Sequence, residues 1–336
     1  MNILIFGAGS VGTHHTHAAR ALKYNAYITD VNENQLEFMK SQLYPKRYGK
    51  WDKKIKIIKF KNIFITKIKF DLIIIGVTPI NHLFLLKKCI KKLKFDKILV
   101  EKPLCVFNQP CSNLLKLKQL NKIYCGFNHT ISSSVQYILK YIKNKKIKDI
   151  KLIEINWKED FDLLLKAHPW IKSLNQTYLS DYKKGGGVLH EFSHAIHLAY
   201  TIKKIVLGRK KIQLNSLVLF NQAVRKYDHI SFIILKSDKT NINVNINGIS
   251  NPPEKNLKIY GKNVKIVWER IENKNIENVK IIKNNKEKNI KFKISRPQDF
   301  INQMKILTNK NSNHKLKNFN KLDSGIEVMK IIRKCM

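Results

Sequence analysis

Three glycines near the N-terminus have the first spacing in the chain that indicates chemistry. Gly7, Gly9 and Gly12 directly follow an apolar run in the pattern Gly-x-Gly-x-x-Gly, with Ser10 and Val11 between the last two. The first glycine of this pattern makes the tight turn from strand to helix, the second lets backbone amides approach a pyrophosphate, and the third lets the helix pack closely on its strand. The helix that follows directs its amides and positive dipole end at the phosphates. The spacing therefore predicts a dinucleotide-binding loop.

Asp30 is the second predicted cofactor residue. It ends the next strand-like run, 18 residues after Gly12, near the position where a carboxylate accepts hydrogen bonds from the adenosine ribose hydroxyls. A carboxylate there repels a 2′-phosphate, and the residues that follow, Val31 and Asn32, include no arginine. We therefore expect NAD(H) to be favoured over NADP(H).

A second group of chemically capable residues lies between residues 187 and 203. At about 100° per residue, His190, His194 and His197 share one face of a helix, with Glu191 beside them. A polar helix face is usually solvated, but three of the chain's 11 histidines on one face favour a functional role. Three further histidines, at positions 14, 15 and 17, are interpreted as the surface of the first helix.

The same stretch permits a metal-dependent alternative. His190, Glu191 and His194 fit His-Glu-x-x-His, the pattern in which two histidines hold zinc and the glutamate acts as a base. A zinc hydrolase would leave the glycine loop and Asp30 unexplained, so we predict no metal site.

The first half of the chain has the pattern of a parallel sheet. Strand-like runs alternate with helix-like stretches, which implies parallel strands joined by helical crossovers. The strands are expected at 2–6, 26–30, 55–59, 71–77, 97–100 and 125–127, and the helices at 11–23, 33–43 and 81–93.

Beyond residue 130 the pattern changes to that of an α+β domain. Extended runs follow one another without long helices between them, which implies a large, mostly antiparallel sheet. These runs are expected at 151–157, 212–220, 229–236, 241–248, 256–260, 264–268, 278–283 and 289–294, and helices at 133–143, 187–203, 297–307 and 324–334. We therefore predict two domains: an NAD(P)-binding, doubly wound Rossmann domain at 1–126, and a substrate-binding and oligomerisation domain at 127–336.

The composition bounds the class of protein. Lys and Arg number 64 and Asp and Glu 24, so the formal net charge is +40. The lysines are scattered through every segment, which favours a compositional bias over a polyanion-binding surface, and nucleic acid is not expected as a partner. The five cysteines form no Cys-x-x-Cys, no run reaches the length of a membrane span, and nothing precedes the first strand as a leader. A cytoplasmic protein is expected.

Four motifs in order give the chain a family resemblance. They are the glycine loop, Thr78-Pro79-x-x-His82, Val100-Glu101-Lys102-Pro103-Leu104, and Gly185-Gly186-Gly187 followed by His194. Together they resemble the glucose-fructose oxidoreductase, inositol dehydrogenase and MocA-like (Gfo/Idh/MocA) family. A narrower likeness, in His168-Pro169-Trp170 and Thr177-Tyr178, resembles a branch associated with surface-polysaccharide sugar gene clusters. The family's Tyr-Asn-Arg segment is similar to Phe127-Asn128-His129, where the arginine is absent.

The resemblance implies a role for each matched residue. Hydride transfer from a carbinol carbon requires a base for the hydroxyl proton; the family implies His194 for this role, with Lys102 polarising the reacting oxygen and Glu191 supporting the histidine. The implied cofactor contacts besides the glycine loop and Asp30 are Thr78, Pro79, His82, Glu101 and Lys102. The implied substrate contacts are Asn128, His168, Trp170, Tyr178 and His197, although the family has Asp where this chain has His197.

The sequence thus predicts an NAD(H)-dependent oxidoreductase acting on a sugar hydroxyl or carbonyl, of an activated or amino sugar in surface-glycan synthesis, and a homodimer or homotetramer. The departures at His129 and His197 leave a second hypothesis open, a dinucleotide-binding sensor or partner protein that has lost catalysis.

Overall fold

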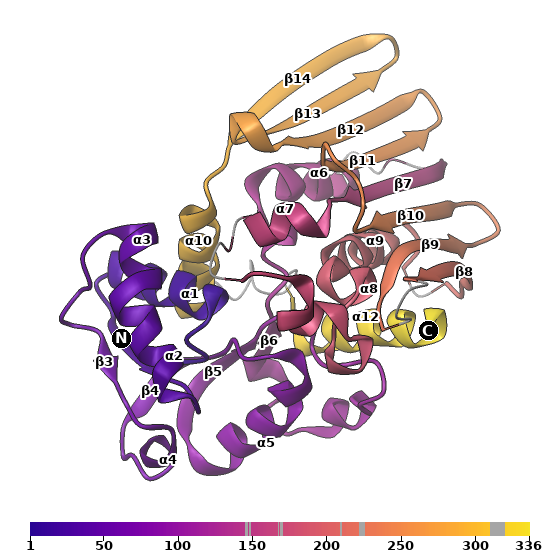
Figure 1. Ribbon diagram of the computed structural model, residues 1–336. Coiled ribbons are helices and arrows are strands. Elements are labelled where there is room, and N and C mark those ends of the chain that lie inside the picture. Colours follow the sequence, from indigo (N-terminus) through magenta and orange to yellow (C-terminus); the bar gives the residue numbers. More distant parts are fainter. Residues whose placement is uncertain are drawn as a thin grey trace. The chain divides into compact units, whose positions relative to one another are not determined.

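The computed structural model describes residues 1–144, 147, 149–166, 168, 171–208, 210–221, 226–309 and 320–336 (Figure 1). The chain forms two compact units. The first comprises Met1–Cys105, Pro110–Asn128 and Ser295–Gly325; the second comprises Val106–Gln109, His129–Ile294 and Ile326–Met336.

The first unit is built on a parallel sheet of six strands in the order β3-β2-β1-β4-β5-β6. This order is that of the doubly wound dinucleotide-binding fold. The strands are β1 (Asn2–Phe6), β2 (Asn25–Thr29), β3 (Lys56–Ile57), β4 (Lys69–Ile75), β5 (Lys94–Val100) and β6 (Ile123–Cys125). Since Phe6 pairs with both Thr29 and Ile75, and Ile75 with Val100, the central strands end at one edge. The loops that carry the predicted cofactor residues leave from this edge.

Helices cover both faces of this sheet, which explains why its central strands read as unbroken apolar runs. The helices are α1 (Ser10–Ala21), α2 (Glu33–Phe38), α3 (Tyr44–Tyr48), α4 (Phe60–Ile63), α5 (His82–Lys92) and α10 (Arg296–Thr308). On one face, Ile3 and Leu72 share a hydrophobic core with α1 and with Phe300 and Met304 of α10. Figure 1 shows α5 across the sheet from α1.

The second unit carries a sheet of eight strands in the order β14-β13-β12-β11-β7-β10-β9-β8. Only the pairing of β7 with β10 is parallel among the pairings of these named strands. The strands are β7 (Ile150–Lys158), β8 (Gln213–Phe220), β9 (Asp228–Lys236), β10 (Asn241–Asn247), β11 (Glu254–Gly261), β12 (Val264–Ile271), β13 (Ile276–Lys283) and β14 (Lys286–Lys293).

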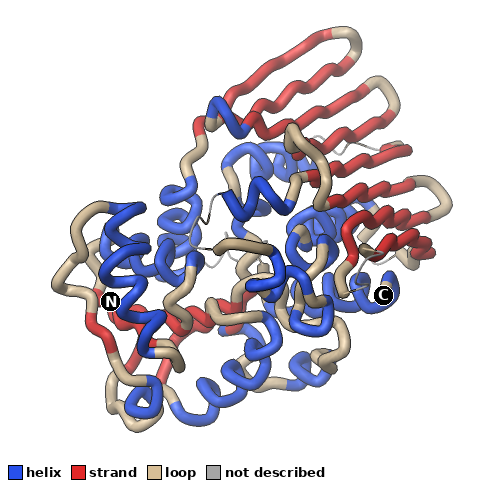
Figure 2. The backbone as a smooth tube through the Cα atoms, viewed as in Figure 1, coloured by secondary structure: helices blue, strands red, loops and turns tan. Residues whose placement is uncertain are grey.

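Helices lie along one face of the large sheet (Figure 2). They include α6 (Ser133–Asn144), α8 (Val188–Glu191) and α9 (Ser193–Val206). Two further helices are α7 (Phe161–Lys166) and α12 (Leu322–Cys335). Along β9, buried side chains alternate with side chains on the other face of the sheet. On that other face Phe232 and Ile234 are 41% and 42% exposed. The predicted fold class, a Rossmann sheet followed by an α+β domain with a large open sheet, is confirmed.

Three local features differ from the sequence interpretation. The helix expected at 33–43 runs through a π-helical segment, Met39–Leu43, into α3. The helix expected at 187–203 is two helices, which meet at Phe192. The segment Ser295–Gly325 joins the first unit, because α10 completes the core over α1; the sequence-based boundary after residue 126 remains a prediction about functional domains.

The interpretation of His14 and His15 as helix surface was wrong. Both side chains are buried, since His14 stacks on Phe300 with ring centres 4.8 Å apart and His15 faces the core. Within the described residues, no helix is long and apolar enough to cross a membrane.

Candidate functional site

The glycine loop joins β1 to α1 in the conformation that the sequence predicts. Gly7 has φ +101°, in the region that favours glycine, and a Cβ on Gly12 would lie 1.8 Å from the Gly7 carbonyl oxygen. Around Gly9, no described atom lies within 4 Å of the place that a Cβ would take. Ser10 and Val11 then begin α1. The loop therefore combines a tight turn, close helix packing and open space beside its second glycine, which fits a dinucleotide pyrophosphate.

Asp30 is fixed beside this loop. Its Oδ2 accepts a hydrogen bond from the Ala8 amide at 2.8 Å and its Oδ1 accepts one from the Asn32 amide at 2.9 Å. Two amide donors hold the carboxylate in one orientation at the end of β2, where a ribose hydroxyl would meet it.

Arg47 is a residue near this loop that sequence reasoning missed. Its Nη1 donates to the Ser10 hydroxyl at 2.9 Å and to the Ser10 carbonyl oxygen at 3.2 Å, and it lies 3.3 Å from Nε2 of His14. Burial lowers the pKa of Arg47. Arg47 reaches the loop from α3 and does not directly follow Asp30, so the residues after β2 give no sign of it.

His82 ties together the loops that follow β4 and β5. Its Nδ1 lies 2.9 Å from the Pro103 carbonyl oxygen and its Nε2 lies 2.9 Å from the Val77 carbonyl oxygen. The side chain is fully buried, and burial lowers its pKa. Thr78 is exposed and Pro79 begins the intervening 3-10 turn. His82 thus acts on the neighbouring backbone and braces the turn that contains Lys102.

Glu101 is held from inside the first unit. His15 Nε2 lies 2.7 Å from Glu101 Oε1, with both side chains almost fully buried, and the Lys102 amide donates to Glu101 Oε2 at 3.3 Å. A Cβ on Gly126 would lie 2.3 Å from this carboxylate, so only glycine leaves room for it. Glu101 therefore links α1, which begins at the glycine loop, to the backbone of Lys102. Lys102 itself is half-buried.

His194 lies in an aromatic cluster of the second unit. Its ring centre is 4.5 Å from that of His129, at an interplanar angle of 73°, and 5.8 Å from that of Trp157. Trp268 also stacks on Trp157, with ring centres 6.4 Å apart. A narrow gap among these side chains is too small for a water molecule. His194 is 8% exposed, so its surroundings are dry and its orientation is defined by rings.

Glu191 is bonded to another predicted residue. The Tyr178 hydroxyl donates to Glu191 Oε2 at 3.1 Å, and both side chains are half-buried. His168 Nδ1 lies 2.7 Å from the Leu164 carbonyl oxygen, one helical turn earlier. Asn128, half-buried, belongs to the first unit. Trp170 lies outside the described residues.

His197 is in the core. It is 1% exposed, and its Nδ1 lies 2.7 Å from the Thr130 hydroxyl. Burial lowers the pKa of His197 to about 3, so the ring is neutral at physiological pH. Its predicted contact with substrate stays a prediction.

A buried carboxylate that the sequence did not reveal holds the start of α8. Asp228 Oδ2 accepts a hydrogen bond from the Leu189 amide at 2.8 Å. Gly187 has φ +83°, and a Cβ there would lie 1.8 Å from Asp228 Oδ1. Burial raises the pKa of Asp228 to about 6. The last glycine of the triple-glycine motif therefore makes room for the carboxylate that caps the helix leading to His194.

The helix break at Phe192 bears on the zinc alternative. His190 and His194 lie on separate helices, and His190 Nδ1 is 3.1 Å from the Gly186 carbonyl oxygen. Across the described ranges, no group of three or more His, Cys, Asp or Glu side chains is placed to hold a metal ion.

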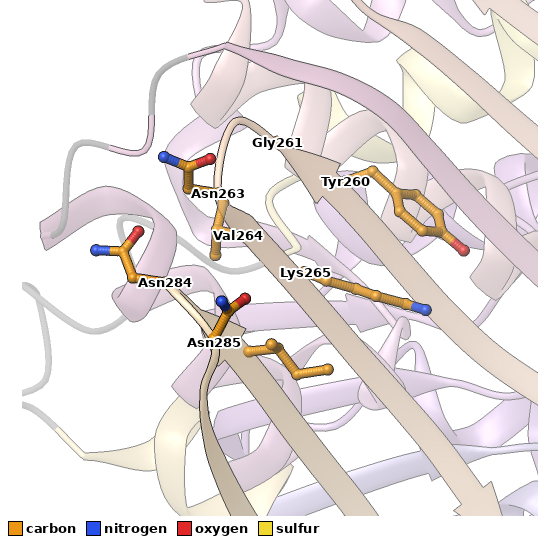
Figure 3. A pocket seen from close by; sticks show the side chains of 8 residues that line it. Tyr260, Gly261, Asn263, Val264, Lys265, Asn284 and Asn285 are labelled. Atoms are coloured by element: carbon orange, nitrogen blue, oxygen red, sulfur yellow. The ribbon is translucent and has the colours of Figure 1, made fainter.

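A larger hollow lies away from all of these residues. It has a volume of about 520 Å³ and opens at the ends of the β11–β12 and β13–β14 hairpins (Figure 3). Its walls include the turn residues Asn263, Asn284 and Asn285 and the pair Tyr260 and Lys265, in which Nζ lies 5.3 Å from the ring centre. None of the predicted site residues lines it.

No family model matches the chain, and no curated protein matches it in sequence. Solved structures do match it in fold. An inositol dehydrogenase homolog from Azotobacter vinelandii, complexed with NAD⁺, aligns over 100% of this chain and 94% of its own, with a TM-score of 0.76 and 11% identity. The UDP-N-acetylglucosamine 3-dehydrogenase GnnA from Acidithiobacillus ferrooxidans aligns over 98% of this chain and 94% of its own, with a TM-score of 0.70 and 11% identity. The 3-ketoreductase KijD10 from Actinomadura kijaniata, in complex with NADP and TDP-benzene, aligns over 98% of this chain and 94% of its own, with a TM-score of 0.69 and 9% identity.

The TM-scores show that the chain shares the fold of these structures, while identities of 9–11% show the fold alone. The resemblance to the Gfo/Idh/MocA family is confirmed in this respect, since the matching structures are of the kind that the sequence motifs indicate.

Proposed function

We propose that this protein is an NAD(H)-dependent oxidoreductase that transfers a hydride to or from the hydroxyl or carbonyl carbon of a sugar. The substrate class that we propose is an activated or amino sugar used in surface-glycan biosynthesis. A nucleotide-linked sugar is anionic, and the net charge of +40 favours its approach.

The observation that carries this proposal is the buried pair of His15 and Glu101. It connects the helix that starts at the glycine loop to the backbone of Lys102, with 2.7 Å between the two side chains. Lys102 is therefore fixed relative to the cofactor loop by an internal contact rather than by loop geometry alone. A backbone fixed in this way supports the role that the family resemblance gives Lys102, the polarisation of a reacting oxygen.

The cofactor contacts follow from the same unit. The amides at the start of α1 would hold the pyrophosphate, and Asp30 the adenosine ribose. A bound nicotinamide dinucleotide supplies the hydride donor or acceptor. We propose NAD(H) over NADP(H) because the carboxylate of Asp30 repels a 2′-phosphate, and both cofactors are to be assayed.

The chain's own groups would move the proton. In oxidation His194 accepts the hydroxyl proton of the substrate, and in reduction it returns one to the carbonyl oxygen. The family resemblance gives Lys102, in the first unit, the role of donating a hydrogen bond to a reacting oxygen as charge develops on it. Tyr178, bonded to Glu191, fixes the carboxylate that supports the histidine.

We further propose a homodimer or homotetramer in the cytoplasm. Apolar side chains on the open face of the large sheet support an oligomer: Leu217, Leu219, Phe232 and Ile234 are all exposed and gather on β8 and β9. A patch of this kind on a sheet is typical of an interface between subunits.

Variants test the assignment directly. Lys102→Ala and His194→Ala should lower turnover by at least about 100-fold. In His194→Ala, which removes none of the implied cofactor contacts, the dissociation constant for NADH should stay within about twofold, as measured by fluorescence titration. The substrates assayed would be a panel of free sugars and nucleotide sugars with NAD⁺, NADH, NADP⁺ and NADPH. Unchanged turnover in both variants would show that other residues carry the chemistry.

One observation favours a second function, a dinucleotide-binding protein without catalysis. His197, in the position where the family has Asp, is buried against Thr130. Tight NADH binding by the wild-type chain with no turnover across the panel would favour this function.

A further inference from the structure

His129 has a second neighbour besides His194. The guanidinium Nη1 of Arg270, on β12, lies 3.3 Å from Nδ1 of His129. The resemblance expects an arginine at position 129, and the sequence has none there. The fold brings an arginine beside this residue from 141 positions further along the chain.

Arg270 is held firmly in this position. Its Nη1 donates to Oε1 of Glu277 at 3.2 Å, and its Nε lies 3.0 Å from Oε1 of Glu272 as an ion pair. Glu277 is 1% exposed and also accepts a hydrogen bond from the Ser134 hydroxyl, which in turn accepts one from Trp268 at 3.0 Å. Burial raises the pKa of Glu272, but Lys255 and Arg270 outweigh it and bring that pKa below its ordinary value. The guanidinium is thus anchored on two sides by carboxylates.

A guanidinium can only donate a hydrogen bond. Nδ1 of His129 must therefore act as the acceptor, which leaves that ring neutral with its proton on Nε2. A neutral ring next to His194 matters, because two imidazolium ions with ring centres 4.5 Å apart would repel each other. His129 in this form leaves His194 able to take up a proton.

We propose that Arg270 is a positioning residue that fixes the tautomer and the charge of His129 and, through the contact of the two rings, the readiness of His194 to accept a proton. The significance of this role for catalysis rests on the proposed function. The contact itself does not.

The charged and titratable groups around His129 come from several elements. Arg270 is on β12, and Glu277, which is paired with it, is on β13. His194 and His197 are on α9. Nζ of Lys255, on β11, lies 5.7 Å from the centre of the Trp157 ring, which packs against His129 and His194. Arg270 and Lys255 oppose a proton on His129, whereas the carboxylates paired with these two cations, Glu277, Glu272 and Glu159, favour one. Removing Arg270 or removing the charge of Glu277 should therefore move the titration of His129 in opposite directions.

The test is histidine NMR on the full-length protein with labelled imidazole rings. The signals of His129 and His194 would be assigned from His129→Gln and His194→Gln. In the wild type, His129 should show an unprotonated, acceptor-type Nδ1 at pH 7. In Arg270→Met the midpoint of its titration should rise by about one pH unit or more, whereas Arg270→Lys, which keeps a cationic donor, should stay near the wild type.

Two further variants keep the proposal falsifiable. Glu277→Gln should lower the midpoint of His129, and it decides the matter if Arg270→Met does not fold. Lys158→Met is the matched control, because it removes a cation of the same sheet that is paired with Glu254 at 2.8 Å. An equal titration of His129 in the wild type, Arg270→Met and Glu277→Gln, or a shift of the same sign in both variants, would overturn the proposal.

These measurements need neither cofactor nor substrate. Loss of turnover in His194→Ala with no effect of Arg270 on His129 would refute this inference and leave the proposed function standing. If the wild-type chain shows no turnover but Arg270 still sets the titration of His129, the proposed function is refuted and this inference stands.

Discussion

The burial of His197 predicts that acid weakens the fold through this one side chain. Its pKa falls to about 3 in the folded chain, from an ordinary value near 6.5, because the ring is desolvated. Between pH 6.5 and about pH 3, His197 is protonated in the unfolded chain and neutral in the folded chain. The stability contributed by the neutral ring is thus present above pH 6.5 and is lost as the pH falls toward 3, by about 1.4 kcal/mol per unit, or about 2 kcal/mol at pH 5.

Asp228 acts in the opposite sense over part of this range. Burial raises its pKa to about 6, so the protonated form is favoured by folding and its contribution is lost as the pH rises through 6. Between pH 7 and 5 the chain would regain about 1 kcal/mol from this group. The pH dependence of the wild type alone is therefore a sum of opposing effects, and only a comparison of variants isolates His197.

The assay is equilibrium urea unfolding followed by circular dichroism at pH 7 and pH 5. His197→Gln keeps a polar partner for Thr130 and cannot titrate. Its loss of unfolding free energy between the two pH values should be about 2 kcal/mol smaller than that of the wild type. His168→Gln, which removes a half-buried histidine, should behave like the wild type. An equal loss in His197→Gln and the wild type would refute the reasoning, since it would mean that the buried ring takes up its proton without cost.

Three further outcomes follow from the structure. Asp228→Asn should retain the helix cap and, in the same unfolding assay, lose the gain of about 1 kcal/mol between pH 7 and pH 5. Gly12→Ala should cost about 3 kcal/mol or more, because its Cβ would meet the Gly7 carbonyl, whereas Gly9→Ala should change stability by less than about 0.5 kcal/mol and weaken NADH binding at least about tenfold in a fluorescence titration. Glu101→Gln should lower kcat about tenfold with little effect on NADH affinity, and a parallel loss of affinity would contradict its assignment as the anchor of Lys102.

Local rules predicted the first sheet well. The central strands are covered on both faces, so they appear in the sequence as apolar runs, and the glycine pattern marks the turn at the end of β1. Asp30 was predicted for a related reason, since it stands just after a strand at the edge where loops gather, whereas Lys102 was assigned through the family resemblance. His15 was within reach of the same reasoning: it lies three residues after Gly12 and four before Ala19, and so shares the face of α1 that packs inward.

Contacts between distant segments were not predictable in this way. Arg270 and His129 belong to elements that meet only because the large sheet folds over α6 and α9, and Asp228 reaches the start of α8 from β9. Periodicity reports which face of an element is apolar, but it does not say which element will cover that face. The break at Phe192 has no recognisable signal in the residues around it.

The place of α10 in the first unit has a consequence for biosynthesis. Phe300, Met304 and Leu307 close the core over α1, although they are translated about 280 residues after it. When the ribosome has released the parallel sheet but not α10, the core over α1 is incomplete, so we expect this unit to depend on chaperones until α10 emerges. Fragments that end near residue 126 should accordingly be recovered as aggregates, and a version of the first unit intended for separate study would have to carry Ser295–Gly325 joined back to it.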